Sequence, residues 1–187
     1  MRNAVRAGWA GIVAALAVAA GAAHAADGKP SAAHVKRGEL LAAFGGCNDC
    51  HTPKTMTPNG PAPDPARLLS GHPADVKLPA MAAGALTPDG WVAATNKDLT
   101  AWVGPWGVSY AANLTPDKAT GIGAWTFTQF AQAMRTGKHL GTGRPILPPM
   151  PWQGVAVLSD ADMKALFTYL MSIKPIANQV PQPTPPK

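Results

Sequence analysis

The sequence Cys47-Asn48-Asp49-Cys50-His51 contains both cysteines of the chain. C-x-x-C-H is the attachment site of c-type haem, in which two thiols add across the vinyl groups of the porphyrin. The histidine after the second cysteine then lies beneath the iron as its proximal ligand. The motif therefore predicts one haem c, attached covalently through Cys47 and Cys50, with His51 as an axial ligand.

Two other kinds of site use a C-x-x-C pair. A zinc site needs further soft ligands, but the chain has no third cysteine, and its other histidines do not form ligand pairs: His24, His34, His72 and His139. A thioredoxin-like dithiol is expected near a βαβ unit, whereas the residues before Cys47 have a helical pattern. Haem attachment is therefore the preferred interpretation.

Three segments are predicted to be helices. The first, residues 31–45, stops at Gly45-Gly46, and its apolar residues recur near helical spacing: Val35, Leu40, Leu41 and Phe44. The second begins with a capping box between Thr126 and Gln129 and ends at Gly137. The third begins at Ser159 and closes at Lys174-Pro175. Its predicted buried stripe consists of Met163, Leu166, Leu170 and Ile173.

The rest of the chain has little long regular structure. Residues 53–125 form an insertion rich in Pro, Gly, Ala and Asn, with a possible short hairpin at 99–110. So long an irregular segment is unusual in a compact domain, but a large apolar macrocycle can act as its core. Residues 176–187 form a proline-rich tail that we expect to be extended and frayed. The predicted fold is mainly α, with three core helices around one haem and a long irregular insertion.

The first 25 residues have the pattern of a secretory signal peptide. Arg2 and Arg6 supply the basic start, an apolar run follows from Trp9 to Ala20, and Ala23-His24-Ala25 supplies a cleavage site. The alternative is an uncleaved anchor, but this run is short of the roughly 20 residues that span a bilayer. The pattern predicts export to the periplasm, with membrane association only through a partner or an uncleaved signal.

Removal of residues 1–25 from the 187-residue chain leaves 162 residues, enough for one domain, which we expect at 26–175. The formal net charge of +6 becomes +4 when Arg2 and Arg6 are lost. The chain contains no run of Lys or Arg, so nucleic acid is an unsuitable partner. A mildly basic surface suits docking to an acidic redox protein, although solubility alone also explains it.

A second axial ligand is predicted at Met150, within Pro148-Pro149-Met150-Pro151-Trp152. The flanking prolines fix φ and reduce the entropy lost when the loop becomes ordered. Met/His ligation raises the reduction potential and leaves no open position on the iron. Met81 is the next candidate, followed by His139 or His72, and the alternative role of Met150 is to fill a gap in the core. Packing on predicted helix faces accounts for three other methionines: Met134, Met163 and Met171.

The order of these features resembles that of class I cytochromes c: an early C-x-x-C-H, a late methionine and a terminal helix with Ala165-Leu166-Phe167-Thr168-Tyr169-Leu170. Four further segments resemble the cytochrome domains of bacterial periplasmic dehydrogenase systems, above all the cytochrome subunits of membrane-bound alcohol dehydrogenases. These segments are Asn113-Leu114-Thr115-Pro116-Asp117, Thr120-Gly121-Ile122-Gly123-Ala124-Trp125, Met134-Arg135-Thr136-Gly137 and Pro149-Met150-Pro151-Trp152. Those subunits typically carry three haem motifs, so this chain resembles a single-domain relative.

The resemblance implies a class I cytochrome c-like fold and further site residues. In class I cytochromes a proline carbonyl downstream of the haem histidine accepts its Nδ1–H, and Pro61 is placed for that role. Arg144, close to the Met150 loop, is a candidate partner of a haem propionate; Asn113 and Trp106 are weaker candidates.

The function implied is that of a one-electron carrier between a dehydrogenase and a downstream respiratory acceptor, such as another cytochrome or an oxidase, and not of an enzyme. The alternative is a haem-based sensor or small-ligand-binding protein with an open or displaceable sixth position on the iron.

Overall fold

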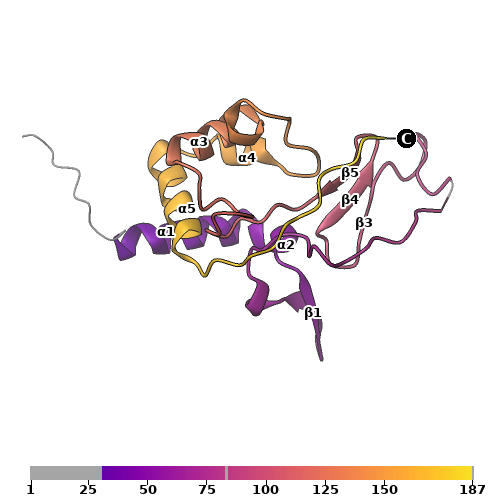
Figure 1. Ribbon diagram of the computed structural model, residues 1–187, viewed down its shortest axis with the longest axis horizontal. Helices are drawn as coiled ribbons and strands as arrows, with labels where there is room; N and C mark the ends of the chain where they lie inside the picture. Colours follow the sequence, from indigo (N-terminus) through magenta and orange to yellow (C-terminus); the bar gives the residue numbers. More distant parts are fainter. Residues whose placement is uncertain (1–30, 83, 187) are drawn as a thin grey trace, which may run out of the picture.

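The structure is a computed structural model that describes residues 31–82 and 84–186 (Figure 1). The predicted signal peptide, residues 1–25, lies outside the described residues. Within them, no helix is both long and apolar enough to cross a bilayer.

All three predicted helices are confirmed. They are α1 (Ala32–Phe44), α3 (Phe127–Thr136) and α5 (Asp160–Ser172). Both halves of the capping box between Thr126 and Gln129 are present at α3, which ends at Gly137 in the left-handed conformation (φ 65°). Two shorter helices were not predicted: α2 (Cys47–His51) and α4 (Trp152–Ala156).

Helices α1 and α5 cross in close contact at Gly38. A Cβ atom on this glycine would collide with the carbonyl oxygen of Ala165 and lie 2.6 Å from the Cβ of Tyr169. Arg37 adds a two-pronged ion pair to Asp162 of α5, with N–O distances of 2.8 and 3.1 Å. The absence of a side chain at Gly38 therefore sets the distance between the two helices.

The apolar residues whose spacing predicted α1 are not all buried in it. Leu40 and Phe44 are 56% and 91% exposed, whereas Gly38 and Ala42 are buried. Two small residues four positions apart lie on one helix face, and that face lets α5 approach more closely than leucine and phenylalanine would. Close packing of the two backbones therefore outweighs burial of the larger side chains at this crossing.

The core lies among α1, α3 and α5. Its buried members are Ala42, Leu69, Ile122, Phe130, Met163, Leu166, Tyr169 and Leu170. Three residues of the predicted stripe on α5 are therefore buried, and the fourth, Ile173, is half-buried. Phe167 packs against Phe127 and Phe130 of α3, with ring centroids 6.0 and 5.2 Å apart.

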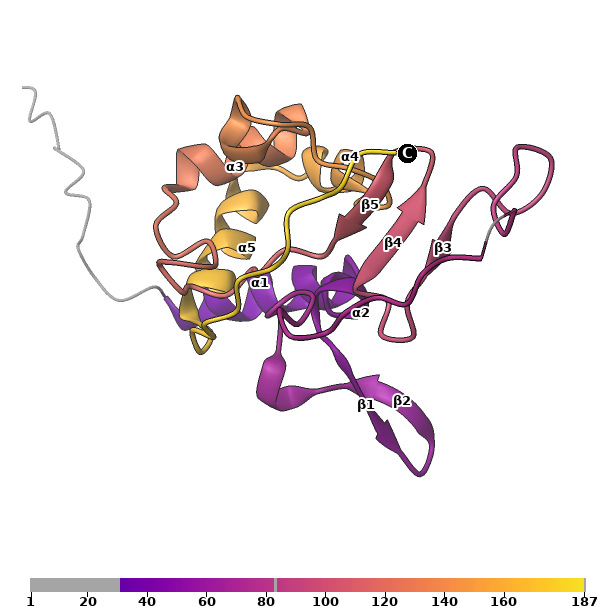
Figure 2. The ribbon, with the colours of Figure 1, turned by 45° about the vertical axis from the view of Figure 1, so that its right-hand side comes forward.

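The insertion is less irregular than predicted because it contains two small antiparallel sheets. One is the hairpin of β1 (Lys54–Thr57) and β2 (Gly60–Pro63), which projects from the body (Figure 2) and is followed by a 3₁₀ turn at Pro65–Arg67. The other has the order β3-β4-β5, with strands at Ala94–Thr95, Ala101–Gly104 and Gly107–Tyr110. The β4–β5 pair confirms the predicted hairpin at 99–110.

The proline-rich tail is extended, as predicted, but it is not frayed. Val108 of β5 and Thr184 exchange backbone hydrogen bonds of 2.9 and 3.0 Å. The side chain of Asn178 donates to the carbonyl oxygens of Ser70 and His72, and accepts from the N–H of Ala74. Figure 2 shows the tail running from α5 past β5. Proline lowers the entropy of the unfolded chain, so a few anchors suffice to order this segment.

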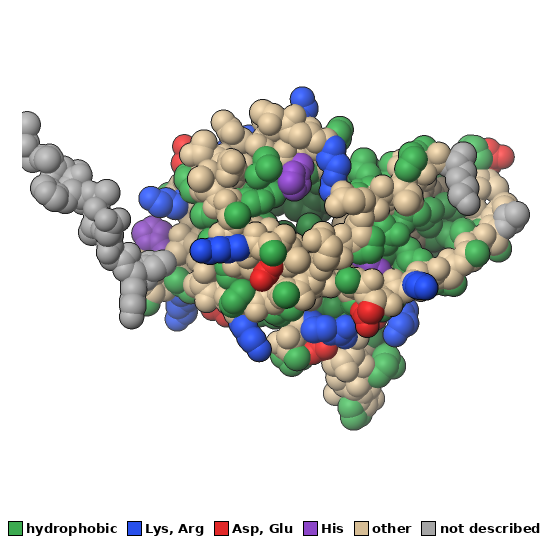
Figure 3. Space-filling view, in the orientation of Figure 1, with side chains coloured by type: hydrophobic (Ala, Val, Ile, Leu, Met, Phe, Trp, Pro, Cys, Tyr) green, Lys and Arg blue, Asp and Glu red, His purple; other side chains and the backbone are tan. Residues whose placement is uncertain are grey.

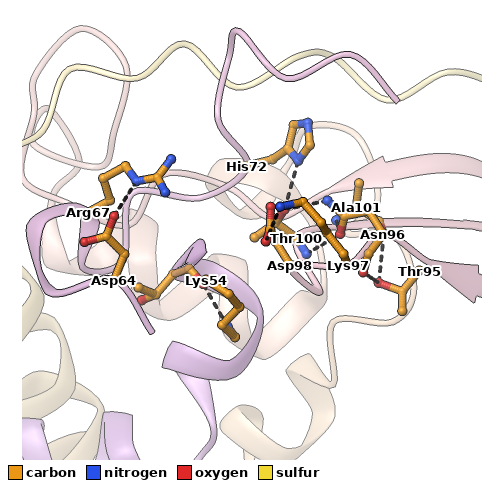
Figure 4. Close-up of polar contacts among 11 residues, drawn as sticks. Lys54, Asp64, Arg67, His72, Thr95, Asn96, Lys97, Asp98, Thr100 and Ala101 are labelled. Atoms are coloured by element: carbon orange, nitrogen blue, oxygen red, sulfur yellow. Dashed lines mark hydrogen bonds and ion pairs between the residues drawn. The ribbon is translucent and has the colours of Figure 1, made fainter. Parts of the chain in front are cut away.

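His72 contacts Thr100, the residue before strand β4 (Figure 4). Its Nε2–H donates to the carbonyl oxygen of Val76 (3.3 Å), so its Nδ1 accepts from the hydroxyl of Thr100 (2.9 Å). Burial lowers the pKa of His72 below its ordinary value, and this effect outweighs the opposing charges of Asp98 and Asp75. The imidazole is therefore held neutral.

We predict that Gly38→Ala lowers the free energy of unfolding by about 1–3 kcal/mol, because the added methyl group must push α1 and α5 apart. The matched control is Gly154→Ala in α4, where a Cβ atom meets open space. That change is expected to be neutral or to stabilise the protein by up to about 1 kcal/mol. Urea unfolding measures both, and equal effects of the two changes would contradict the close crossing.

The His72 network predicts a loss of stability in mild acid. As the pH falls below about 6.5, the unfolded chain takes up a proton at this residue before the folded chain does. The free energy of unfolding therefore falls until the pH passes the lowered folded-state pKa. In unfolding measurements from pH 7.5 to 5, His72→Asn should lose less stability than the wild type, whereas His34→Asn should follow the wild type. Parallel curves for His72→Asn and the wild type would contradict this assignment.

Candidate haem site

All of the predicted haem-binding residues except Pro61 line one cavity of about 650 Å³. Cys47, Cys50 and His51 lie on its wall, and Met150 lines it as well. Further walls come from β5, from α3 and from residues 179–183 of the tail. Figure 3 shows the surface hollowed between the helical part of the molecule and the strands. Residues far apart in the chain thus meet at a single site.

Two glycines turn the chain from α1 into α2. The N–H of Gly45 closes α1 by donating to the carbonyl oxygen of Leu41 (2.8 Å), and Gly46 follows in the left-handed conformation (φ 65°). Residues three positions apart lie on the same face of a helix, so α2 presents the thiols of Cys47 and Cys50 together. Both thiols are free and half-buried, and burial raises the pKa of each.

His51 is 8% exposed, and its ring is oriented by one hydrogen bond. Its Nδ1 lies 2.7 Å from the carbonyl oxygen of Ala112. A carbonyl can only accept, so Nδ1 carries the proton and Nε2 keeps its lone pair. Burial lowers the pKa of His51 and favours the neutral ring, which is the form that binds a metal. Among the described residues, Nε2 has no hydrogen-bond partner.

The predicted role of Pro61 is wrong, because the acceptor of the His51 Nδ1–H is Ala112. Pro61 is exposed and pairs with Met56 in the projecting β1–β2 hairpin. The chain after β5 instead returns beside α2, close to a segment whose Gly71 N–H donates to the carbonyl oxygen of His51 (2.7 Å). A backbone acceptor carries no side-chain signal, so the sequence offered no means of locating Ala112.

Lys54 is a site residue that the sequence analysis missed. Its ammonium group donates to the carbonyl oxygens of Asn48, Asp49 and Thr52, at 3.3, 2.7 and 2.8 Å. The last carbonyls of a helix lack partners within the helix, and here one cation satisfies carbonyls at the end of α2. Lys54 therefore stabilises the turn that presents Cys50 and His51.

The structure separates the candidates for the second axial ligand. Met150 and His139 line the cavity that His51 also lines. Met81 is 46% exposed and does not line the cavity. His72 is buried elsewhere, with both ring nitrogens engaged. Met134, assigned from the sequence to packing alone, also lines the cavity. Two thioethers and one imidazole thus share the cavity with His51.

Arg144 and Asn113, the two polar candidates on the cavity wall, differ in whether their side chains are free to bind a ligand. Arg144 lines the cavity and is exposed, and its guanidinium donates only to the carbonyl oxygen of Pro145 (3.3 Å) among the described residues. Asn113 is buried, and its amide donates to Thr120 and to the carbonyl oxygen of Ile176, at 3.1 and 2.8 Å. Asn113 therefore anchors the tail, whereas Arg144 keeps donors for an anionic group.

These residues fit a c-type haem. Two free thiols on one face of α2 match two vinyl groups, and a neutral imidazole with an unengaged Nε2 matches an iron ligand. The wall is mostly apolar, as a macrocycle requires, and includes Trp102, Leu114, Ile122 and Phe130. When bound, the iron of such a haem supplies one-electron redox chemistry.

Comparison with known proteins found several relatives, although no family model matches the chain. A nicotinate dehydrogenase subunit from Pseudomonas putida is 35% identical over 82% of this chain, and the gluconate 2-dehydrogenase cytochrome c subunit of Pantoea cypripedii is 35% identical over 81%. The cytochrome c subunit of alcohol dehydrogenase (quinone) from Gluconobacter oxydans is 33% identical over 92%. The matched regions span only 10%, 26% and 28% of these relatives. The resemblance seen in the sequence motifs is thereby confirmed, and the chain is a relative of the cytochrome c subunits of bacterial dehydrogenases.

Proposed function

We propose that this protein is a periplasmic mono-haem cytochrome c that carries single electrons from a dehydrogenase to a downstream respiratory acceptor. The observation that supports it most is the single cavity lined by Cys47, Cys50, His51 and Met150. The first three supply covalent attachment and one axial ligand. Met150 supplies the second ligand, from a loop on another part of the wall.

Ligation by His51 and Met150 suits electron transfer better than catalysis. Two protein ligands leave no open position on the iron, and a thioether raises the reduction potential relative to a second histidine. The carrier then performs no bond chemistry of its own. Arg144, whose charge faces no acidic partner among the described residues, binds a propionate and offsets its charge near the mouth of the cavity.

We infer the electron donor from the enzymes to which the relatives belong. Their names place them in nicotinate, gluconate, alcohol and fructose dehydrogenases. This chain matches only part of each, so it acts as one cytochrome domain that a dehydrogenase or its cytochrome reduces. Redox encounters of this type use small interfaces and weak affinity, which the mildly basic charge of the chain assists.

Production with haem-attachment machinery should yield a coloured protein whose mass is raised by one covalent haem. Cys47→Ser/Cys50→Ser is the control and should yield a colourless chain.

Mixing the oxidised protein with a quinone-dependent alcohol, gluconate or fructose dehydrogenase and its substrate should reduce the haem. The rate of reduction should fall with added salt, because salt screens exposed charges. A colourless wild type, or no reduction by any of the three, would contradict the proposal.

The ligand assignment predicts that Met150→Ala abolishes the weak far-red absorption band of sulfur-ligated ferric haem and lowers the reduction potential. Met134→Ala tests the other thioether in the cavity, and Met81→Ala serves as an exposed control; both should keep the band. Loss of the band in Met134→Ala, with retention in Met150→Ala, would assign the sulfur ligand to α3 instead. Rapid CO binding by the reduced wild type would favour the alternative of a ligand-binding haem protein.

A further inference from the structure

One hydrogen bond joins the Met150 loop to strand β5, and both segments line the cavity. The hydroxyl of Ser109, in strand β5, donates to the carbonyl oxygen of Pro148 at 2.6 Å. Ser109 is buried, and Pro148 lies two residues before Met150. The two bonded residues are 39 positions apart in the chain, so the contact is a tertiary one that ties the insertion to the loop.

The hydroxyl of Ser109 also accepts a hydrogen bond from a third residue. The indole Nε1–H of Trp106 donates to the hydroxyl oxygen of Ser109 at 3.2 Å. An indole N–H can only donate and a carbonyl can only accept. The one hydroxyl proton of Ser109 is therefore directed to Pro148, and the three residues form a relay in which every donor and acceptor is assigned.

The β5 end of the relay is held in place from both sides. Ser109 pairs with Trp102 of β4, and its neighbour Val108 pairs with Thr184 of the tail. Gly107, in the left-handed region (φ 90°), passes so close to the tail that a Cβ atom there would collide with the carbonyl oxygen of Thr184. Strand β5 is thus a fixed support, and the relay extends it to the loop.

The loop has few other restraints of its own. Within residues 147–151, the hydrogen bond from Met150 N–H to the carbonyl oxygen of Leu147 is local (3.3 Å), and the carbonyl of Pro151 belongs to the start of α4. Among the described residues, the bond from Ser109 is the one that reaches from another part of the fold to this stretch. Pro149 then transmits the placement of Pro148, because its ring fixes φ.

We propose that Ser109 is a positioning residue that keeps the Met150 thioether on the iron, acting through the carbonyl of Pro148 and with Trp106 orienting its hydroxyl. This inference rests on the proposed ligation by Met150. It gives the β4–β5 hairpin a role beyond covering the haem, because the hairpin governs how readily the sixth position opens to an external ligand.

The test is titration of the ferric holoprotein with imidazole, which must displace the methionine in order to bind. An external ligand binds more tightly as the open population rises. Loss of one buried hydrogen bond raises that population by about 10-fold. Ser109→Ala should therefore bind imidazole about 10-fold more tightly than the wild type. Ser109→Thr keeps a hydroxyl and should restore wild-type affinity, and Trp106→Phe should give an intermediate value.

A double-mutant comparison separates positioning from general loosening. On a Met150→Ala background the sixth position is already open, so adding Ser109→Ala should change imidazole affinity less than about 2-fold. A 10-fold tightening on that background, or wild-type affinity in Ser109→Ala alone, would overturn the role of Ser109. If Met150→Ala itself bound imidazole with wild-type affinity, the proposed ligation would fail, and that result is distinct from failure of the relay.

Discussion

The hydrogen bond from His51 Nδ1 to the carbonyl oxygen of Ala112 is the interaction on which the site depends. It selects the tautomer whose Nε2 is available to a metal, and it fixes the ring against rotation. It also joins α2 to the chain that leaves β5, so the histidine and the hairpin wall are placed by one bond. The neighbouring bonds from Gly71 and His72 to His51 and Ala111 extend the same junction. His51 and the hairpin wall are therefore positioned relative to each other.

The insertion and the tail supply the cavity walls that the helices do not provide. The three long helices form a core beside the cavity, and the apolar residues of that core do not enclose a macrocycle by themselves. The β4–β5 hairpin supplies another wall, and the tail closes it by pairing with β5 and lining the cavity at residues 179–183. Asn178 and Asn113 anchor the tail through their amides. Segments that lack helical pattern are thus ordered by specific polar contacts.

The sequence predicted the features that local chemistry encodes. The capping box at Thr126, the left-handed Gly137 and the cap at Ser159 all depend on neighbours within four residues, and all are present. The errors concern partners that are distant in the chain. Pro61 was assigned a carbonyl role that Ala112 performs, and no pattern marked Gly38 and Ala42 as the buried residues of α1. The carbonyl of Ala112 and the absent side chain of Gly38 produce no hydrophobic or charged pattern in the sequence. Neither contact could therefore be predicted without the tertiary structure.

The distribution of the site along the chain has a consequence for folding. The cavity wall takes residues from Gly45 to Pro183, and the contacts that join these parts are mostly single hydrogen bonds. A bound macrocycle would bury apolar surface against all of these segments at once, and apolar burial is the larger stabilising contribution. The hydrogen bonds would then select one arrangement, and burial against the haem would help to hold the strands and the tail against the helices. A haem attached at Cys47 and Cys50 would thus provide the core against which the β4–β5 hairpin and the tail pack.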